Sequence, residues 1–283
     1  MKKILLTLLV LIIMLTVAVG ASGCGQNAKN QQEFSQETIG SSEVKEEDTI
    51  ERIKKAGKLV VGTSADYPPF EFHQVVNGKD EIVGFDIDLA RAISKELGVE
   101  LEIKDMDFKS IIPAVLSKTV DIGIAGFTIT EEREKSVNFS IPYLEGDQQI
   151  ITYKGSGIKG KEDLKGKTVG VQIGTTGEEA AKKIEGVTLK QFDSVDAAIM
   201  DLLNKRIEAV IVDVAVAKAY ASNNPGKLEL VSETIEDEAK AVVLRKGDEK
   251  LLEVVNKVIK NLKESGELDK LIKKWFIDYK PAN

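Results

Sequence analysis

Apolar and polar positions alternate in a way that predicts strands and helices in turn along most of the chain. Short apolar runs bounded by glycine or polar residues are typical of buried strands, and apolar residues spaced three and four apart are typical of helices. In the first half, strands are predicted at 58–62, 101–103 and 120–125, and helices at 84–97 and 111–116. A strand, helix, strand order of this kind indicates a parallel α/β sheet.

The same order recurs in the second half of the chain, without detectable sequence similarity to the first. The predicted elements are strands 166–171, 187–191 and 208–212 and helices 178–184, 195–203 and 215–221. The pattern therefore predicts two α/β lobes.

Two extended segments, 142–151 and 234–244, are interpreted as crossings between these lobes. The amphipathic helices predicted at 251–264 and 268–276 are expected to pack back on the first lobe. We therefore expect a discontinuous first lobe, 48–146 with 240–279, and a continuous second lobe, 147–239.

The beginning of the chain has the pattern of an export signal. Lys2 and Lys3 precede an apolar run from Ile4 to Val19, and small residues follow. This order indicates a signal peptide over 1–23 rather than a spanning helix. Ala21-Ser22-Gly23-Cys24 resembles a bacterial lipobox, which predicts lipidation at Cys24; a plain secreted protein is the alternative. Residues 24–47 are so polar that we expect a flexible tether.

Composition excludes several classes of function. The formal net charge of −7 argues against a nucleic-acid partner. With one cysteine, the chain forms no internal disulfide, and a catalytic thiol is disfavoured. The single histidine, His73, is expected to be solvated in a polar loop. Since no set of metal ligands is apparent, we expect neither a metal nor a cofactor.

The chemically informative residues follow the predicted strands. Ligands bind at the carboxyl ends of strands in open parallel sheets. The candidate residues there are Ser64, Asp66, Tyr67, Phe108, Gly126, Phe127, Thr128, Arg133, Gln172, Thr175, Thr176 and Asp213. This set can hold a zwitterion, with Arg133 and amide groups for a carboxylate and Asp213 for an ammonium.

Each charged candidate also has a simpler interpretation. Arg133 lies in the first turn of a helix predicted to start at Thr130, where it could pair with the neighbouring glutamates. Asp213 could be the N-cap of helix 215–221, and Asp66 could cap the turn before Pro68.

Several motifs, in order, resemble the family 3 extracellular solute-binding proteins, the amino-acid receptors of ABC importers. They are Gly62-Thr-Ser-Ala-Asp-Tyr-Pro-Pro-Phe70, Gly84-Phe-Asp-Ile-Asp88, Asp107-Phe108, Gly126-x-Thr128-x-Thr-x-x-Arg133, Gly174-Thr-Thr176 and Lys273-Lys-Trp-Phe276. The resemblance implies two Rossmann-like lobes of the type II periplasmic binding protein fold. It also implies that a two-strand hinge joins the lobes and that they close over one amino acid.

The resemblance also implies a role for each candidate. Arg133, Thr128 and the backbone near Thr175 and Thr176 would hold the ligand's α-carboxylate. The α-ammonium would go to Asp213 and the Gly126 carbonyl, and Tyr67 and Phe108 would sandwich the side chain. Selectivity would be set by Gln172, Ser64 and Asp66. One departure is visible at 238–242, Glu-Ala-Lys-Ala-Val, where relatives commonly have a Tyr-Gly pair.

The expected ligand is a basic amino acid, arginine or lysine first, and then glutamine, histidine or cystine. Two ring faces suit an extended cation, and Asp66 would repel an acidic ligand. The expected protein is a monomeric, non-enzymatic receptor, lipid-anchored to the outer face of the bacterial cell membrane, that delivers its ligand to an ABC permease. The alternatives are a periplasmic cyclohexadienyl dehydratase with Asp66 or Glu145 as general acid, and a less favoured sensor module.

Overall fold

The computed structural model describes residues 48–279, apart from the side chains of 236–238. The predicted signal peptide, Cys24 and the tether lie outside the described residues. Between 48 and 279, no helix has both the length and the apolar character needed to cross a membrane.

The first lobe contains a five-stranded sheet in the order β5-β1-β6-β13-β7. Its strands are β1 (Lys58–Thr63), β5 (Glu100–Asp105), β6 (Ile122–Gly123), β7 (Val137–Phe139) and β13 (Val243–Arg245). β1 runs parallel to β5 and β6, and β13 is antiparallel to β6 and β7. The accompanying helices are α1 (Thr49–Ala56), α2 (Phe85–Leu97), α3 (Phe108–Leu116), α8 (Glu249–Glu264) and α9 (Glu267–Ile272). Leu59, Phe85, Ile93 and Val255 belong to one buried cluster, so α2 and α8 share the core with β1.

The second lobe repeats this plan with the sheet order β10-β9-β11-β8-β12. Its strands are β8 (Leu144–Tyr153), β9 (Thr168–Gln172), β10 (Thr188–Phe192), β11 (Ala209–Asp213) and β12 (Leu228–Lys240). The helices are α5 (Thr176–Lys182), α6 (Val195–Leu203) and α7 (Val214–Asn223), and a short helical turn, η1 (Lys161–Leu164), precedes β9. The prediction of two parallel α/β lobes is confirmed.

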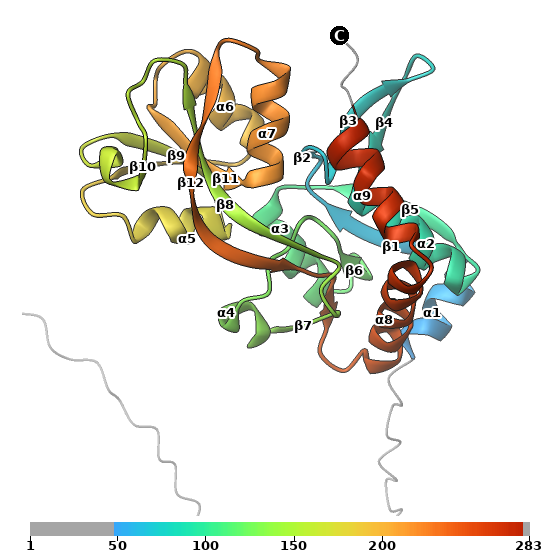
Figure 1. Cartoon of the computed structure of the whole chain (residues 1–283). Coiled ribbons are helices and arrows are strands. Elements are labelled where there is room, and N and C mark those ends of the chain that lie inside the picture. The colour runs from blue at the N-terminus through green and yellow to red at the C-terminus, as the bar shows by residue number, and fades with distance from the viewer. Residues whose placement is uncertain (1–47, 280–283) are drawn as a thin grey trace, which may run out of the picture. The chain divides into compact units, whose positions relative to one another are not determined.

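Strands β8 and β12 connect the two sheets (Figure 1). They are antiparallel partners, with Leu144 opposite Lys240 at the end near the first lobe and Leu228 opposite Tyr153 at the far end. The register shifts twice between Leu230 and Asp237. The predicted pair of crossing segments is therefore a single two-stranded ribbon, while the exact lobe boundaries remain a prediction.

Strand β6 is shorter than the predicted strand 120–125. The strand ends at Gly123, and Gly126, with a left-handed φ of +54°, turns the chain away soon after it. A short helix, α4 (Glu131–Glu134), follows. This early departure turns residues 126–133 towards the second lobe.

A three-stranded sheet, not predicted from the sequence, follows β1. It consists of β2 (Asp66–Tyr67), β3 (Glu71–Val76) and β4 (Lys79–Val83). The interpretation of His73 as a residue of a polar loop is therefore wrong. His73 belongs to β3, and its ring has Nδ1 2.8 Å from Asp80 and Nε2 3.3 Å from Asp105. Asn77-Gly78, both with positive φ, is a strong hairpin signal that predicts this turn.

Residues of η2 (Lys273–Asp278), near the end of the described chain, contact the start of α2. The Trp275 Nε1 group donates to Asp88 at 2.8 Å, and Lys274 pairs with the same carboxylate at 2.6 Å. Phe276 packs edge-on against Phe85. Two motifs almost two hundred residues apart thus stabilise one corner of the first lobe.

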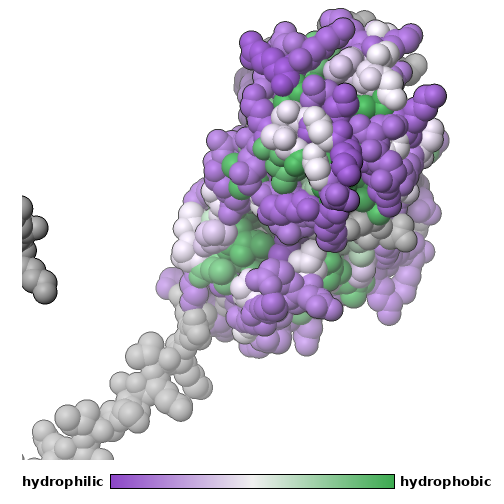
Figure 2. All heavy atoms as spheres, turned by 90° about the vertical axis from the view of Figure 1, so that its left-hand side faces the viewer, coloured by the Kyte–Doolittle hydropathy of each residue, from purple (hydrophilic) through white to green (hydrophobic). Residues whose placement is uncertain are grey.

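Polar side chains cover most of the face seen in Figure 2, with apolar side chains in small separate areas between them. This is the face turned towards the left-hand side of Figure 1, where β10 and α5 lie. A polar surface of this kind agrees with a chain in which 30% of the residues are charged.

Candidate ligand-binding site

A small cavity lies where the carboxyl ends of β1 and β9 face each other between the lobes. Ten of the twelve candidate residues line it: Ser64, Asp66, Tyr67, Phe108, Gly126, Thr128, Arg133, Gln172, Thr175 and Thr176. The structure adds Glu71, Ala125 and Lys240 to this lining. The free space is about 10 Å³, which is roughly enough for one water molecule.

Arg133 spans the gap between the lobes. Its helix starts at the predicted N-cap, since the Thr130 hydroxyl accepts from the Arg133 backbone amide at 3.2 Å. The guanidinium donates through Nη1 to the Thr128 carbonyl at 2.7 Å and through Nη2 to the Gly174 carbonyl at 3.0 Å. A guanidinium is a planar fork of donors that also suits a carboxylate, so a ligand carboxylate could take the place of these carbonyls.

Aromatic rings support the same guanidinium. Its carbon lies 5.4 Å from the centre of the Phe108 ring and 5.3 Å from that of Phe127. The two rings are stacked, with centres 4.5 Å apart. Phe127 is fully buried behind Phe108 and does not line the cavity.

The second lobe presents helix α5 to this arginine. Thr175 is its N-cap and accepts from the Glu178 amide at 3.2 Å. The hydroxyl of Thr176 lies 3.4 Å from that of Thr128 in the first lobe. Amides at the start of a helix favour an anion, so this end of the cavity suits a carboxylate.

Asp66 connects the lobes on the other side. Its carboxylate accepts from Ser64 at 2.9 Å, from Gln172 at 3.0 Å and from the Val195 amide at the start of α6 at 2.6 Å. Burial is the main cause that raises the pKa of Asp66 from 3.8 to about 6, although these hydrogen bonds oppose it. The neutral and charged forms are therefore both populated near pH 6.

Asp213 is both a helix cap and an ion-pair partner. Its carboxylate accepts from the Ala215 amide at 3.2 Å, so the N-cap interpretation is confirmed. The other oxygen lies 2.6 Å from the ammonium of Lys240, and both side chains are 1% exposed. Lys240 is a site residue that sequence reasoning missed, although the unusual segment 238–242 was the available signal.

A buried group of acidic and phenolic side chains adjoins the cavity, and Glu71 of this group also lines it. Asp86 accepts from the Gly126 amide at 2.7 Å and from the Tyr143 hydroxyl at 3.0 Å. Burial raises the pKa of Asp86 to about 6. Burial, and then the nearby Asp86 charge, raises the pKa of Glu71 well above its ordinary value. The group fixes Gly126, where a Cβ would come within 3.3 Å of the Tyr67 ring.

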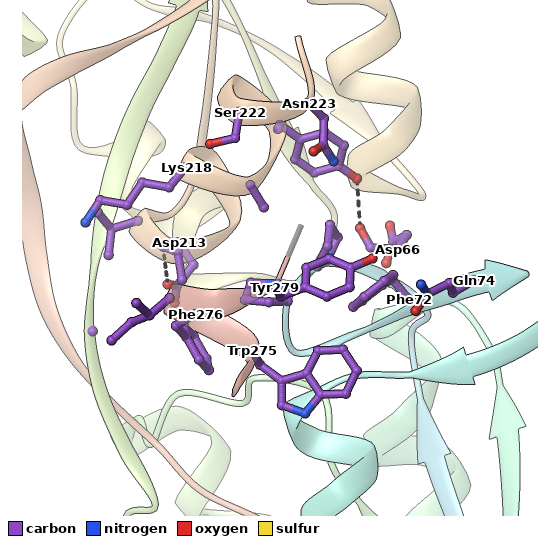
Figure 3. A pocket seen from close by; sticks show the side chains of 18 of the residues that line it. Asp66, Phe72, Gln74, Asp213, Lys218, Ser222, Asn223, Trp275, Phe276 and Tyr279 are labelled. Carbon is purple, nitrogen blue, oxygen red and sulfur yellow. Dashed lines mark hydrogen bonds between the residues drawn. The ribbon is translucent and has the colours of Figure 1, made fainter. Parts of the chain in front are cut away.

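A larger hollow of about 800 Å³ opens beside this cavity (Figure 3). Trp275, Phe276 and Tyr279 line it from the end of the chain, and α7 lines it from the second lobe. Asp66 lines both spaces, and Asp213 lines the larger one and contacts Lys240 of the smaller one. Arg133, Thr175 and Thr176 line the smaller cavity and not the larger hollow. The smaller cavity is therefore the candidate ligand-binding site.

Comparison with known proteins agrees with the geometry. Residues 59–278 match the bacterial extracellular solute-binding proteins, family 3. The chain belongs to this family. A curated relative of this family 3 protein is the arginine-binding extracellular protein ArtP of Bacillus subtilis, strain 168. It is 40% identical over 223 residues, which cover 77% of this chain and 86% of the relative.

Two solved structures are also similar to this family 3 protein. An ancestral arginine-binding protein bound to arginine is 50% identical, with a TM-score of 0.74, over 78% of this chain and 98% of that one. The ancestral amino-acid-binding protein AncCDT-1, described as a precursor of cyclohexadienyl dehydratase, is 40% identical, with a TM-score of 0.75, over 81% and 99%. The first of these proteins is bound to arginine. The second is described as the precursor of an enzyme.

Proposed function

We propose that this protein is a receptor that binds one free amino acid, arginine first and lysine next, and delivers it to an ABC permease. The observation that carries the proposal is that Arg133, the start of helix α5 and the carboxylate of Asp66 all line one cavity. An amino acid with a cationic side chain offers a carboxylate to the first two and a cation to the third. Tyr67 and Phe108 add ring faces to the same lining.

The direct test is calorimetric titration with a full panel of amino acids. We expect arginine to bind most tightly, lysine next, and glutamine, histidine and cystine more weakly. A protein that binds aspartate or leucine best contradicts the assignment of the ligand. A protein that binds no amino acid contradicts the receptor itself.

A second candidate is a dehydratase of cyclohexadienyl amino acids, favoured by the similarity to AncCDT-1. Such an enzyme needs a general acid in the cleft with a pKa near neutral pH. Asp66, with its pKa of about 6, meets that requirement, and Glu71, whose pKa burial also raises, lines the same cavity. Loss of prephenate or arogenate on incubation supports the enzyme, and unchanged substrate with tight arginine binding supports the receptor.

The pKa of Asp66 gives a prediction about pH. Because this pKa is raised, a neutral carboxyl stabilises the free protein at low pH, and that contribution is lost as the pH rises through 6. A bound cation needs the carboxylate instead. We expect arginine affinity, measured by calorimetry, to be about tenfold weaker at pH 5 than at pH 7, since one pKa unit is a factor of ten.

Asp66→Asn is the matched control for this prediction. The amide keeps the size of the side chain and does not titrate, so the change between pH 5 and pH 7 should largely disappear. The preference for arginine and lysine over glutamine should also collapse. A wild type that binds neither cation, or a mutant with unchanged selectivity, contradicts the role given to Asp66.

We further propose that Cys24 carries a lipid that holds the receptor at the outer face of the membrane. Cys24→Ser should release the protein into the medium or periplasm, because a single tether carries no part of the binding site. Fractionation of the cells measures the release, and titration should give unchanged affinity. Mutant protein that stays in the membrane fraction contradicts the lipid anchor.

A further inference from the structure

Lys240 is the last residue of β12, where the second crossing strand returns to the first lobe. Its carbonyl accepts from the Tyr143 amide at 2.8 Å, and its backbone bridges to that of Thr128. Leu144 is its partner in the ribbon of β8 and β12. The backbone is therefore held on three sides, so a displacement of Lys240 would have to come from its side chain.

The side chain places an ammonium inside the protein. Lys240 is 1% exposed, and burying an ammonium is costly unless charged and polar groups surround it. Asp213 Oδ2 lies 2.6 Å from Nζ, and the Thr128 hydroxyl accepts from Nζ at 3.0 Å. One partner belongs to each lobe, so Lys240 bridges the cleft beside Arg133.

This environment is what the α-ammonium of an amino acid requires. The ligand's α-ammonium and the lysine Nζ are both primary ammonium groups with three donors. Asp213 is the carboxylate that the family resemblance assigns to the α-ammonium. The Thr128 carbonyl accepts from Arg133, the residue proposed to bind the ligand's carboxylate. The lysine thus presents the same chemical group to the same acceptors.

The site cannot hold both ammonium groups in this arrangement. Asp213 Oδ1 accepts from the Ala215 amide and Oδ2 lies 2.6 Å from the Lys240 ammonium, so both oxygens already have partners. Two like charges at one carboxylate repel strongly where little water screens them. A ligand ammonium can therefore reach Asp213 only after the lysine side chain has left it.

We propose that Lys240 is a tethered competitor for the amino-group subsite, which a bound amino acid displaces from Asp213. The inference rests on the proposed receptor function and deepens it. Lys240 lowers the affinity for ligands by holding the subsite. The lysine also favours those ligands whose contacts with Arg133 and Asp66 supply enough binding free energy to displace it.

The test compares two ligands on two forms of the full chain, purified in detergent and titrated at pH 8. The ligands are L-arginine and 5-guanidinopentanoate, which is arginine without its α-amino group. Lys240→Met keeps an unbranched side chain, one atom shorter, and removes the charge. Lys154→Met, which removes a charge from an exposed lysine of the second lobe, is the matched control.

We expect Lys240→Met to bind arginine at least tenfold more tightly than the wild type, and Lys154→Met to be unchanged. Loss of the α-amino group should weaken binding at least tenfold more in Lys240→Met than in the wild type. The reason is that the wild-type lysine still satisfies Asp213 when the analogue is bound. Lys240→Gln, which keeps a neutral donor for Asp213, gives the same comparison if the methionine variant does not fold.

The outcomes separate the two proposals. Equal or weaker arginine binding by both Lys240 variants overturns the competitor role, because the lysine then supports the ligand or only the fold. If the wild type binds arginine normally in that experiment, the receptor function stands. A wild type that binds no amino acid overturns both.

Discussion

Replacing Arg133 by lysine should weaken binding of the amino acid by roughly 30-fold to several-thousand-fold and leave the fold intact. The guanidinium offers two parallel donors, which now face the Thr128 and Gly174 carbonyls across the cleft, and a lysine is a single point charge. Truncating one partner of a buried, hydrogen-bonded charge pair costs about 2–5 kcal/mol. Lysine also gives up the stacking on Phe108. Calorimetry measures the loss.

Arg206→Lys is the control for this prediction. Arg206 is exposed and pairs with Asp201 on the second lobe, and surface pairs of this kind contribute at most about 1 kcal/mol. It should have near-normal affinity and stability. An Arg133→Lys variant with wild-type affinity would show that the arginine does not hold the ligand.

Asp213→Asn should destabilise the protein by about 3–5 kcal/mol, which is typical of a buried ion pair that loses one member. Asparagine is a good helix cap, so the contact to Ala215 can be kept and the charge alone is removed. The ammonium of Lys240 is then left inside the protein without its 2.6 Å partner. Amino-acid affinity should fall as well, since the ligand's ammonium loses the same carboxylate. Denaturant unfolding and titration measure the two effects.

A double variant tests whether the unpaired buried charge causes the loss of stability. Asp213→Asn combined with Lys240→Met removes both buried charges and should recover most of the lost stability, but not the affinity. Glu185→Gln, at an exposed ion pair with Lys165, should have almost no effect. A double variant as unstable as Asp213→Asn alone would mean that the ion pair does not explain the loss.

Much of the fold follows from local patterns in the sequence. Helix α6 has the bounds predicted for it because Ser194 caps its first turn and apolar residues recur at helical spacing. The candidate site could be predicted for a related reason, because parallel strands bring their carboxyl ends to one edge of the sheet. Ser64, Gln172 and Thr176 could be grouped without knowledge of any contact between them.

The charged interior could not be derived in the same way. Lys240 follows a run of acids in a segment that reads as a polar crossing, and its partner Asp213 is in a different strand. Glu71 lies in an alternating stretch whose strand pairing was not recognised, so its burial was not expected. Pairings of this kind depend on tertiary packing, which sequence periodicity does not encode.

The contacts of Asp66 with Gln172 and with the Val195 amide join the lobes without involving a ligand. If the proposed ligand is enclosed behind them, its release requires that these bonds and the exposed ion pair of Lys109 with Asp193 break. The residence time of the ligand then depends on how often the cleft opens, and not only on the strength of the ligand's own contacts. Two amino acids of equal affinity could therefore be released at different rates, if one of them strengthens these bonds and the other does not.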